Sequence, residues 1–216
     1  YSEWRVLPEA GNAPHYRGSF EVLNKAYSLA LNEAGALLNE EGTFRTGANW
    51  PTVWTRDISY ATHLGLGLWN VHACMKSLNA RVRNGEVEQD TGTGGSWPIS
   101  SDRVVWGMAA WEVYCLTGDA GWLARSCRVL EKTCMRDEQV LAATGGLVKG
   151  ESSFLDWREQ SYPAWMTSAD IGDSCSLSTM VLHAEARKVL ARMFRELGLE
   201  EKAREWEEKS VSLSAV

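Results

Sequence analysis

Three segments of this sequence combine tryptophan with acidic residues and arginine, and each also contains glycine or proline. Segment 1 is residues 48–57 (ANWPTVWTRD), segment 2 is residues 94–103 (GGSWPISSDR) and segment 3 is residues 150–159 (GESSFLDWRE). Indole rings stack on the apolar faces of sugars, aspartate and arginine hydrogen-bond sugar hydroxyls, and a carboxylic acid can protonate a glycosidic oxygen. These residue types in these combinations favour a carbohydrate site.

The spacing of apolar residues predicts that helices carry the three segments. Between residues 177 and 197 the apolar side chains recur at intervals of three and four, and no comparable stretch alternates with a period of two. The sequence therefore predicts an all-α protein. Gly65, Gly67 and Asn70 leave open whether the second and third helices are one bent helix. The expected helices are 18–38, 56–68, 70–83, 102–117, 120–137, 176–197 and 200–214.

Residues with capping propensity mark several helix ends. Asp102 and Asp119 are expected to N-cap the fourth and fifth helices, and Gly118 and Gly198 to end the fourth and sixth. Short connections between helices predict antiparallel hairpins. The longer loops before the fourth and sixth helices are of a size that is usually functional or disordered, and their aromatic content argues against disorder.

The three segments are expected to meet in space. Segment 1 leads into the second helix, segment 2 leads into the fourth, and segment 3 precedes the sixth. If these alternate helices lie side by side and parallel, their N-termini share one end of the bundle, where anionic groups are favoured. The sequence thus predicts a single pocket formed by all three segments.

Length and charge exclude several classes of partner. The chain has 216 residues and a net charge of −6, and its basic residues are interspersed with acids. It therefore lacks the basic face that nucleic-acid binding needs, and its apolar runs are shorter than the ~20 residues of a membrane span. Neither nucleic acid nor a membrane is an expected partner. The compartment is left open between cytoplasm, periplasm and secretion.

The cysteines and histidines show no metal-ligand spacing. Five cysteines form no C-x-x-C pair, and Cys127 and Cys134 lie seven residues apart on one face of an expected helix. Buried free thiols are the favoured interpretation, and we expect neither a metal nor another cofactor. The sequence begins at Tyr1 without a signal-peptide pattern, so we expect a processed product or a piece of a longer protein.

Segment 1 carries a resemblance to a known family. Trp54-Thr55-Arg56-Asp57 resembles the Trp-Thr-Arg-Asp signature of glucoamylases, members of the six-hairpin, or (α/α)6-toroid, glycosidases. This family also includes trehalases, glucosidase I-like enzymes and bacterial debranching-type proteins. The resemblance implies that Arg56 and Asp57 bind substrate hydroxyls in the subsite where the bond is cleaved.

The other two segments resemble the same family. Ser101-Asp102-Arg103 is similar to its second inner-helix segment, and segment 3 is similar to the Glu-Ser-Gly-Trp-Asp stretch of trehalase-like members, whose aspartate is the general acid. On that match Asp156 is the acid. Segment 3 has one residue more than that stretch, so Glu159 and Glu151 remain alternative acids. The substrate-binding set is Trp54, Arg56, Asp57, Trp97, Asp102, Arg103, Trp157 and Arg158.

The resemblance implies a partial (α/α)6 toroid over residues 18–216, preceded by an extension or linker at 1–17. The expected activity is hydrolysis of an oligosaccharide or glycoside, α-linked, with an inverting general acid/base mechanism. The family's catalytic base lies in later hairpins, so we expect this chain alone to be inactive. An incomplete toroid exposes apolar edges, which predicts self-association or a C-terminal segment that covers them.

Structural roles and other functions remain alternatives. Arg56 and Asp57 could form a local ion pair, Trp54 and Trp157 could belong to the core, and Asp102 could be only an N-cap. A non-catalytic carbohydrate-binding domain is the first alternative function, and a helical-repeat interaction protein is the second. For Trp50, Trp97, Trp106 and Trp165 packing and binding are equally favoured. Packing is expected for Trp69, Trp111, Trp122 and Trp206.

Overall fold

The computed structural model describes residues 14–153 and 162–215, and within them the chain is all-α, as predicted. A two-stranded hairpin, Val82–Arg83 (β1) with Glu86–Val87 (β2), is its small β element. Shorter turns are a π-helical turn at Thr62–Leu66 and 3-10 turns at Asp102–Val105 and Thr144–Gly146. The α-helices are α1 (Glu21–Ala36), α2 (Thr55–Ala61), α3 (Gly67–Ala80), α4 (Trp106–Thr117), α5 (Ala120–Val140), α6 (Ser168–Asp173), α7 (Leu177–Glu196) and α8 (Glu200–Ser214).

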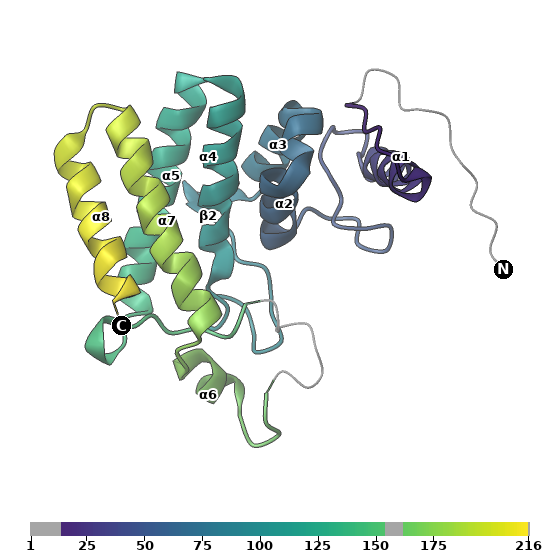
Figure 1. Cartoon of the computed structure of the whole chain (residues 1–216). Coiled ribbons are helices and arrows are strands. Elements are labelled where there is room, and N and C mark those ends of the chain that lie inside the picture. Colours follow the sequence, from purple (N-terminus) through teal and green to yellow (C-terminus); the bar gives the residue numbers. More distant parts are fainter. Residues whose placement is uncertain (1–13, 154–161, 216) are drawn as a thin grey trace.

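Helices α2 and α3 are two helices and not one bent helix. The backbone leaves helical geometry at Gly65 (φ 170°, ψ −36°) and again at Asn70 (φ −148°, ψ 75°). Between these points the chain reverses, so α2 and α3 lie side by side (Figure 1). Weak helix formers at these two positions explain why the reversal occurs there.

The turns within the hairpins α4/α5 and α7/α8 lie where the sequence predicted them, at Gly118-Asp119 and at Gly198. Gly118 follows α4 with a left-handed φ of 64°, and Asp119 caps α5 by accepting a hydrogen bond from Trp122 N at 3.0 Å. Gly198, with φ 72°, stands between α7 and α8. A residue without a Cβ adopts this backbone region at no steric cost, so each glycine permits a tight reversal.

The Asp119 cap allows a direct test of helix-end energetics. Asp119→Ala removes the acceptor for Trp122 N and should lower the free energy of unfolding by about 1 kcal/mol, measured by urea denaturation. Asp119→Asn is the matched control, because asparagine caps helices about as well as aspartate. Equal loss in both variants would show that the charge, and not the cap, contributes the stability.

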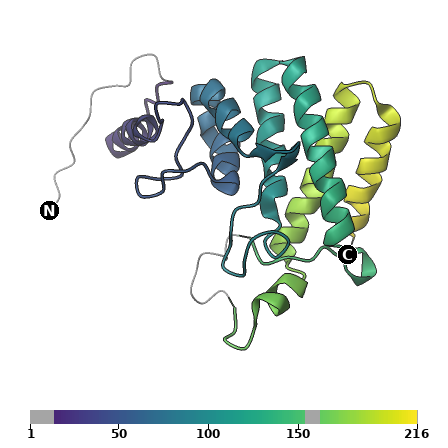
Figure 2. The same cartoon turned by 180° about the vertical axis from the view of Figure 1, so that it is seen from behind.

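Two elements differ from the sequence prediction. The helix expected to reach residue 83 ends at Ala80, and the chain turns through Asn84 (φ 53°) and Gly85 (φ 76°) into a β-hairpin. Asn-Gly suits such a two-residue turn because both positions need positive φ. The hairpin packs on α5, where Val87 N donates to Thr133 Oγ1 at 3.0 Å (Figure 2). The loop expected at 138–175 contains α6, which starts with a capping box formed by Thr167 and Asp170.

The core lies between the helices and is anchored by tryptophans. The rings of Trp106 and Trp122 lie 6.3 Å apart, and their indole N–H groups donate to Leu78 O at 3.0 Å and Ala110 O at 2.8 Å. Each large ring is thus buried with its polar atom satisfied, as stable burial requires. Packing is confirmed for Trp122 and Trp206, which are buried, and for Trp69 and Trp111, which pack against the core; Trp106 joins them.

Three of the five cysteines are buried free thiols, as predicted. Cys74, Cys127 and Cys134 are free and buried, and burial raises the pKa of the Cys74 and Cys127 thiols to about 11 and about 12. They act as small apolar side chains. Cys115 and Cys175 are free but exposed, so the expectation of buried thiols was wrong for these two. Within the described ranges, no helix is both long and apolar enough to cross a membrane.

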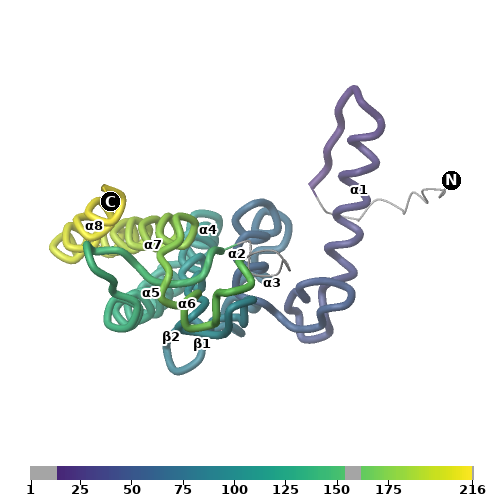
Figure 3. The backbone as a smooth tube through the Cα atoms, turned by 90° about the horizontal axis from the view of Figure 1, so that it is seen from below, coloured from purple at the N-terminus to yellow at the C-terminus, as the bar shows by residue number. Residues whose placement is uncertain are grey.

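Helix α1 stands apart from the helices that form the core. In the described part of the chain it contains no buried residue, and it projects away from the other helices (Figure 3). Residues 37–54 connect it to α2, and Phe44 within this connection is buried and lies against Trp69, with ring centroids 5.8 Å apart. The connection is therefore anchored to the core, whereas α1 is not.

Candidate functional site

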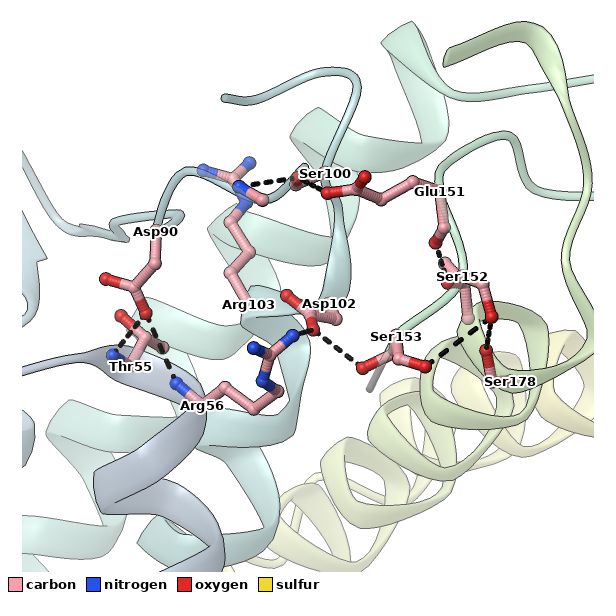
Figure 4. Close-up of polar contacts among 12 residues, drawn as sticks. Thr55, Arg56, Asp90, Ser100, Asp102, Arg103, Glu151, Ser152, Ser153 and Ser178 are labelled. Atoms are coloured by element: carbon pink, nitrogen blue, oxygen red, sulfur yellow. Dashed lines mark hydrogen bonds and ion pairs between the residues drawn. The ribbon is translucent and has the colours of Figure 1, made fainter. Parts of the chain in front are cut away.

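The three Trp-and-acid segments meet at one end of the bundle, which confirms the predicted convergence. Arg56 Nη1 of segment 1 lies 2.9 Å from Asp102 Oδ2 of segment 2, and Ser153 Oγ of segment 3 donates to the same oxygen at 2.6 Å. Figure 4 shows these side chains pointing toward one another from three separate elements. The Asp102 carboxylate thereby joins Arg56, which lies 46 positions before it, to Ser153, which lies 51 positions after it.

The arrangement follows from the helix packing. Helix α4 packs against both α2 and α7, and the segments approach these helices from the same end of the bundle (Figure 1). Asp102 does not N-cap α4, so that prediction was wrong. It is the first residue of the 3-10 turn Asp102–Val105, and its carboxylate binds other segments instead of the amides of its own helix.

Asp102 is the hub of the site. It is 5% exposed, and besides Arg56 and Ser153 it accepts a hydrogen bond from Gln89 Nε2 at 2.7 Å. Gln89 Oε1 in turn accepts from Arg103 N at 2.8 Å, which fixes the orientation of the amide. A buried carboxylate is stable only when paired and hydrogen-bonded, and Asp102 is both. It therefore acts as a rigid anchor for Arg56.

A second carboxylate, Asp90, holds the start of α2 and was not identified from the sequence. Its Oδ2 accepts from the backbone N–H groups of Thr55 and Arg56, and its Oδ1 lies 2.9 Å from Arg81 Nη2. Burial raises the pKa of Asp90 to about 6, although the Arg81 guanidinium and the two amides act in the opposite direction. A sequence search for caps looks for residues adjacent to the helix, so this distant cap escapes it.

Glu151 of segment 3 is enclosed by the glycine-rich loop 92–95. Its carboxylate accepts hydrogen bonds from the Ser100 hydroxyl and from Gly94 N, the latter at 2.7 Å, and the residue is 3% exposed. A Cβ at position 92 would lie 1.6 Å from Glu151 Oε1, so a larger residue there would displace the Glu151 carboxylate. Glu151 thus ties segment 3 to segment 2; its assignment as an alternative acid stays a prediction.

Two tryptophans flank the start of α2 at the surface. Trp50 and Trp54 are in edge-to-face contact, with ring centroids 5.5 Å apart and planes at 68°. Trp54 Nε1 donates to Thr52 Oγ1 at 2.9 Å, and Trp50 is 57% exposed. Exposed aromatic surface is suited to sugar stacking, and these two rings precede the helix that carries Arg56. Trp165, 73% exposed, lies elsewhere, in the loop before α6.

Two other residues of α2, Asp57 and Tyr60, have different surroundings. Asp57 is exposed and lines a pocket of about 310 Å³ between α1 and α2, together with Ala34 and Arg45. Tyr60 is half-buried, and burial together with the Asp102 charge raises the pKa of its phenol to about 12. The Tyr60 hydroxyl therefore stays protonated at neutral pH.

Arg103 and Trp97 belong to a separate cluster around the buried Asp137. Arg103 Nη2 lies 2.6 Å from Asp137 Oδ1, and Trp97 Nε1 donates to the same oxygen at 2.9 Å. Two guanidinium groups lie over the Trp97 ring, those of Arg103 at 4.9 Å and Arg136 at 5.4 Å. Sugar binding by Trp97 and Arg103 stays a prediction, while the contacts show them joining segment 2 to α5.

Buried His183 joins helix α7 to segment 2. Its Nε2 lies 2.9 Å from Ser101 O, and burial lowers its pKa, although the Asp137 charge opposes this. A neutral ring that donates from Nε2 to the carbonyl satisfies this geometry. Helix α7 is thereby fixed to the residue that precedes Asp102.

Four of the predicted site residues fall outside the described ranges. They are Asp156, Trp157, Arg158 and Glu159. Within residues 14–153 and 162–215, no group of three or more His, Cys, Asp and Glu side chains is arranged to hold a metal ion. No protein-family model, curated protein or solved structure matches the chain.

Proposed function

We propose that this chain is a glycoside hydrolase-like domain that binds an oligosaccharide where the three segments meet. The observation that carries the proposal is the convergence of Arg56 and Ser153 on the Asp102 carboxylate, with the Trp50–Trp54 pair in the same sequence segment as Arg56. Aromatic surface for the apolar sugar face and fixed charged groups for the hydroxyls are the two components of carbohydrate recognition.

Arg56 is the principal sugar-binding residue in this proposal. Its side chain is 15% exposed, so a sugar hydroxyl can approach the guanidinium while Asp102 fixes it from within the bundle. A charged group that is already oriented binds with less loss of conformational entropy than a mobile one. The site therefore favours binding through pre-organisation.

The proposed chemistry requires two carboxyl groups, one as acid and one activating water. Asp156 is the proposed acid on the resemblance of segment 3, with Glu159 and Glu151 as alternatives. Substrates are proposed to be α-linked and cleaved with inversion. No residue of this chain is assigned as the base, so binding is the first property to test.

Sugar binding can be tested by comparing the parent chain with a variant at Arg56. Titration of the chain with maltotriose and trehalose, with cellotriose as the β-linked comparison, should change tryptophan fluorescence. Arg56→Ala should weaken binding at least about tenfold, because it removes a charge-assisted hydrogen bond. Arg204→Ala, at an exposed position of α8, is the matched control and should bind as the parent does. Equal affinity of Arg56→Ala and parent for every sugar would contradict the proposal.

A non-catalytic sugar-binding domain is the second candidate. It is favoured by the three described carboxylates around the site, Asp90, Asp102 and Glu151, which all serve as hydrogen-bonded anchors. Because this chain alone is expected to be inactive, the two functions are separated by an assay of product release in a longer version that includes the later hairpins of the toroid. In a hydrolase, Asp156→Asn should abolish turnover and retain affinity, whereas a binding domain has no turnover to lose.

A further inference from the structure

The start of α2 is fixed by groups from two other parts of the chain. Asp90, which follows the β-hairpin, accepts from Thr55 N and from Arg56 N, the latter at 3.4 Å. Arg81, at the end of α3, binds both the Asp90 carboxylate at 2.9 Å and Thr55 Oγ1 at 3.1 Å. Thr55 Oγ1 also donates to Glu88 O at 2.8 Å. The first turn of α2 is therefore fixed by contacts far from it in sequence.

We propose that Asp90 is a positioning residue for the sugar site, which holds the first turn of α2 so that Arg56 meets Asp102. The inference rests on the proposed function, because it concerns the arginine that binds the sugar. Asp90 binds the backbone of Arg56, whereas Asp102 binds its side chain at 2.9 Å. Two carboxylates thus fix the same residue at both ends, and only one of them belongs to a Trp-and-acid segment.

The charges around Asp90 make this arrangement sensitive to pH. The charge of Arg81 favours the ionised carboxylate, as do the hydrogen bonds from the Thr55 and Arg56 amides, and the charge of Asp102 from the 3-10 turn disfavours it. Glu88, which follows β2, lies 3.5 Å from Arg81 Nη1 and shares that cation. Burial outweighs these groups and raises the pKa of Asp90 to about 6. Asp90 is ionised at pH 7.5 and largely protonated at pH 5.

Protonation of Asp90 should weaken sugar binding but increase the stability of the fold. Protonation removes the charge that strengthens the hydrogen bonds to Thr55 N and Arg56 N, so sugar affinity falls below about pH 6. The raised pKa also means that burying the ionised form costs folding free energy. The contribution of Asp90 to stability is therefore fully present below its ordinary pKa and is lost as the pH rises through about 6. Weaker binding in acid thus cannot be ascribed to unfolding by this group.

The first measurement needs no sugar. A titration of backbone amide chemical shifts from pH 4.5 to 8 should show Thr55 and Arg56 N–H groups changing with a common midpoint near pH 6. Asp90→Asn should abolish that midpoint. Arg81→Gln should move it upward, because a cation that favours the ionised form is lost. Glu208→Gln, on the exposed face of α8, should leave it unchanged.

The second measurement is maltotriose affinity across the same pH range. In the parent chain affinity should fall about tenfold between pH 7.5 and 5, the effect expected for one charge-assisted hydrogen bond. Asp90→Asn should bind at pH 7.5 as weakly as the parent does at pH 5, with no midpoint. If Asp90→Asn does not fold, the upward shift in Arg81→Gln provides the same test.

The two measurements distinguish failure of the inference from failure of the proposed function. Amides that titrate near pH 6, without binding of any sugar, would support the positioning of α2 by Asp90 and overturn the sugar site. Sugar binding that does not depend on pH, with amides that do not titrate, would overturn the role of Asp90 and leave the sugar site in place. Sugar binding that keeps its pH midpoint in Asp90→Asn would also overturn it.

Discussion

Asp137→Ala should destabilise the chain by about 3–5 kcal/mol, the range found when one partner of a buried ion pair is removed. Asp137 and Arg103 are 2% and 6% exposed, and their closest atoms lie 2.6 Å apart. The substitution leaves the Arg103 guanidinium buried without a counter-charge. It also removes the acceptor of the Trp97 indole, 2.9 Å away. Both losses act in the same direction.

Replacing both partners with apolar residues should cost much less. In the described part of the chain, Asp137 Oδ2 and Arg103 Nε are buried without hydrogen-bond partners, so the pair is incompletely satisfied. The double variant Arg103→Met/Asp137→Leu removes both desolvated charges and should recover most of the stability lost in Asp137→Ala. Urea denaturation of Arg103→Met, Asp137→Leu and the double variant at pH 7 measures the coupling energy between the two residues.

The outcome of that double-mutant cycle decides the role of Arg103. A double variant that is stable and binds maltotriose like the parent would show that Arg103 acts by joining segment 2 to α5. Strong coupling in stability, together with lost sugar affinity in the double variant, would support the substrate-binding role predicted from the sequence. Additive destabilisation by the two single changes would contradict the ion pair as the source of the effect.

The sequence predicted the features that depend on local chemistry. Gly118 and Gly198 end helices because they adopt positive φ, and Asp119 caps α5 because its carboxylate reaches Trp122 N three residues ahead. The convergence of the segments followed from the order of helices and short connections. These properties need no knowledge of which distant side chains come into contact.

Pairings between distant residues could not be predicted in this way. Asp90 lies 34 positions after Arg56, from whose backbone N–H it accepts, and Arg103 and Asp137 are also 34 positions apart. No pattern of spacing within one element encodes such contacts. The β-hairpin was missed for another reason: apolar spacing extended the helix to residue 83, although Asn84-Gly85 is a strong turn signal.

Adjacent residues of one motif were also separated by local geometry. Asp102 and Arg103 are neighbours in segment 2, yet Asp102 contacts Arg56 whereas Arg103 contacts Asp137. They lie in a 3-10 turn, in which successive side chains point about 120° apart. Two adjacent charged residues at the start of a helix therefore cannot both face one site, and the motif alone does not show which of them does.

Asp102→Asn should weaken maltotriose binding by about 100-fold while leaving the chain folded. Hydrogen bonds to a charged group contribute about 1.5–3 kcal/mol each, and Asp102 receives them from Arg56, Gln89 and Ser153. An amide in its place presents N–H groups to at least one of these donors. Arg56 then loses the counter-charge that Asp102 supplies, so the guanidinium is held less firmly in one orientation.

Affinity should be lost in a variant that stays folded, and this combination separates a role in the site from a role in the fold. Asp102→Asn is expected to lower the free energy of unfolding by about 1–3 kcal/mol, as for other buried hydrogen-bonded groups. Fluorescence titration and urea denaturation of the same preparations provide both values, with Glu208→Gln as the surface control. Asp102→Glu keeps the charge but lengthens the side chain, so partial recovery of affinity would show that the anchor acts through both charge and position. Undiminished maltotriose binding by Asp102→Asn would mean that the three segments converge for structural reasons and that the sugar binds elsewhere.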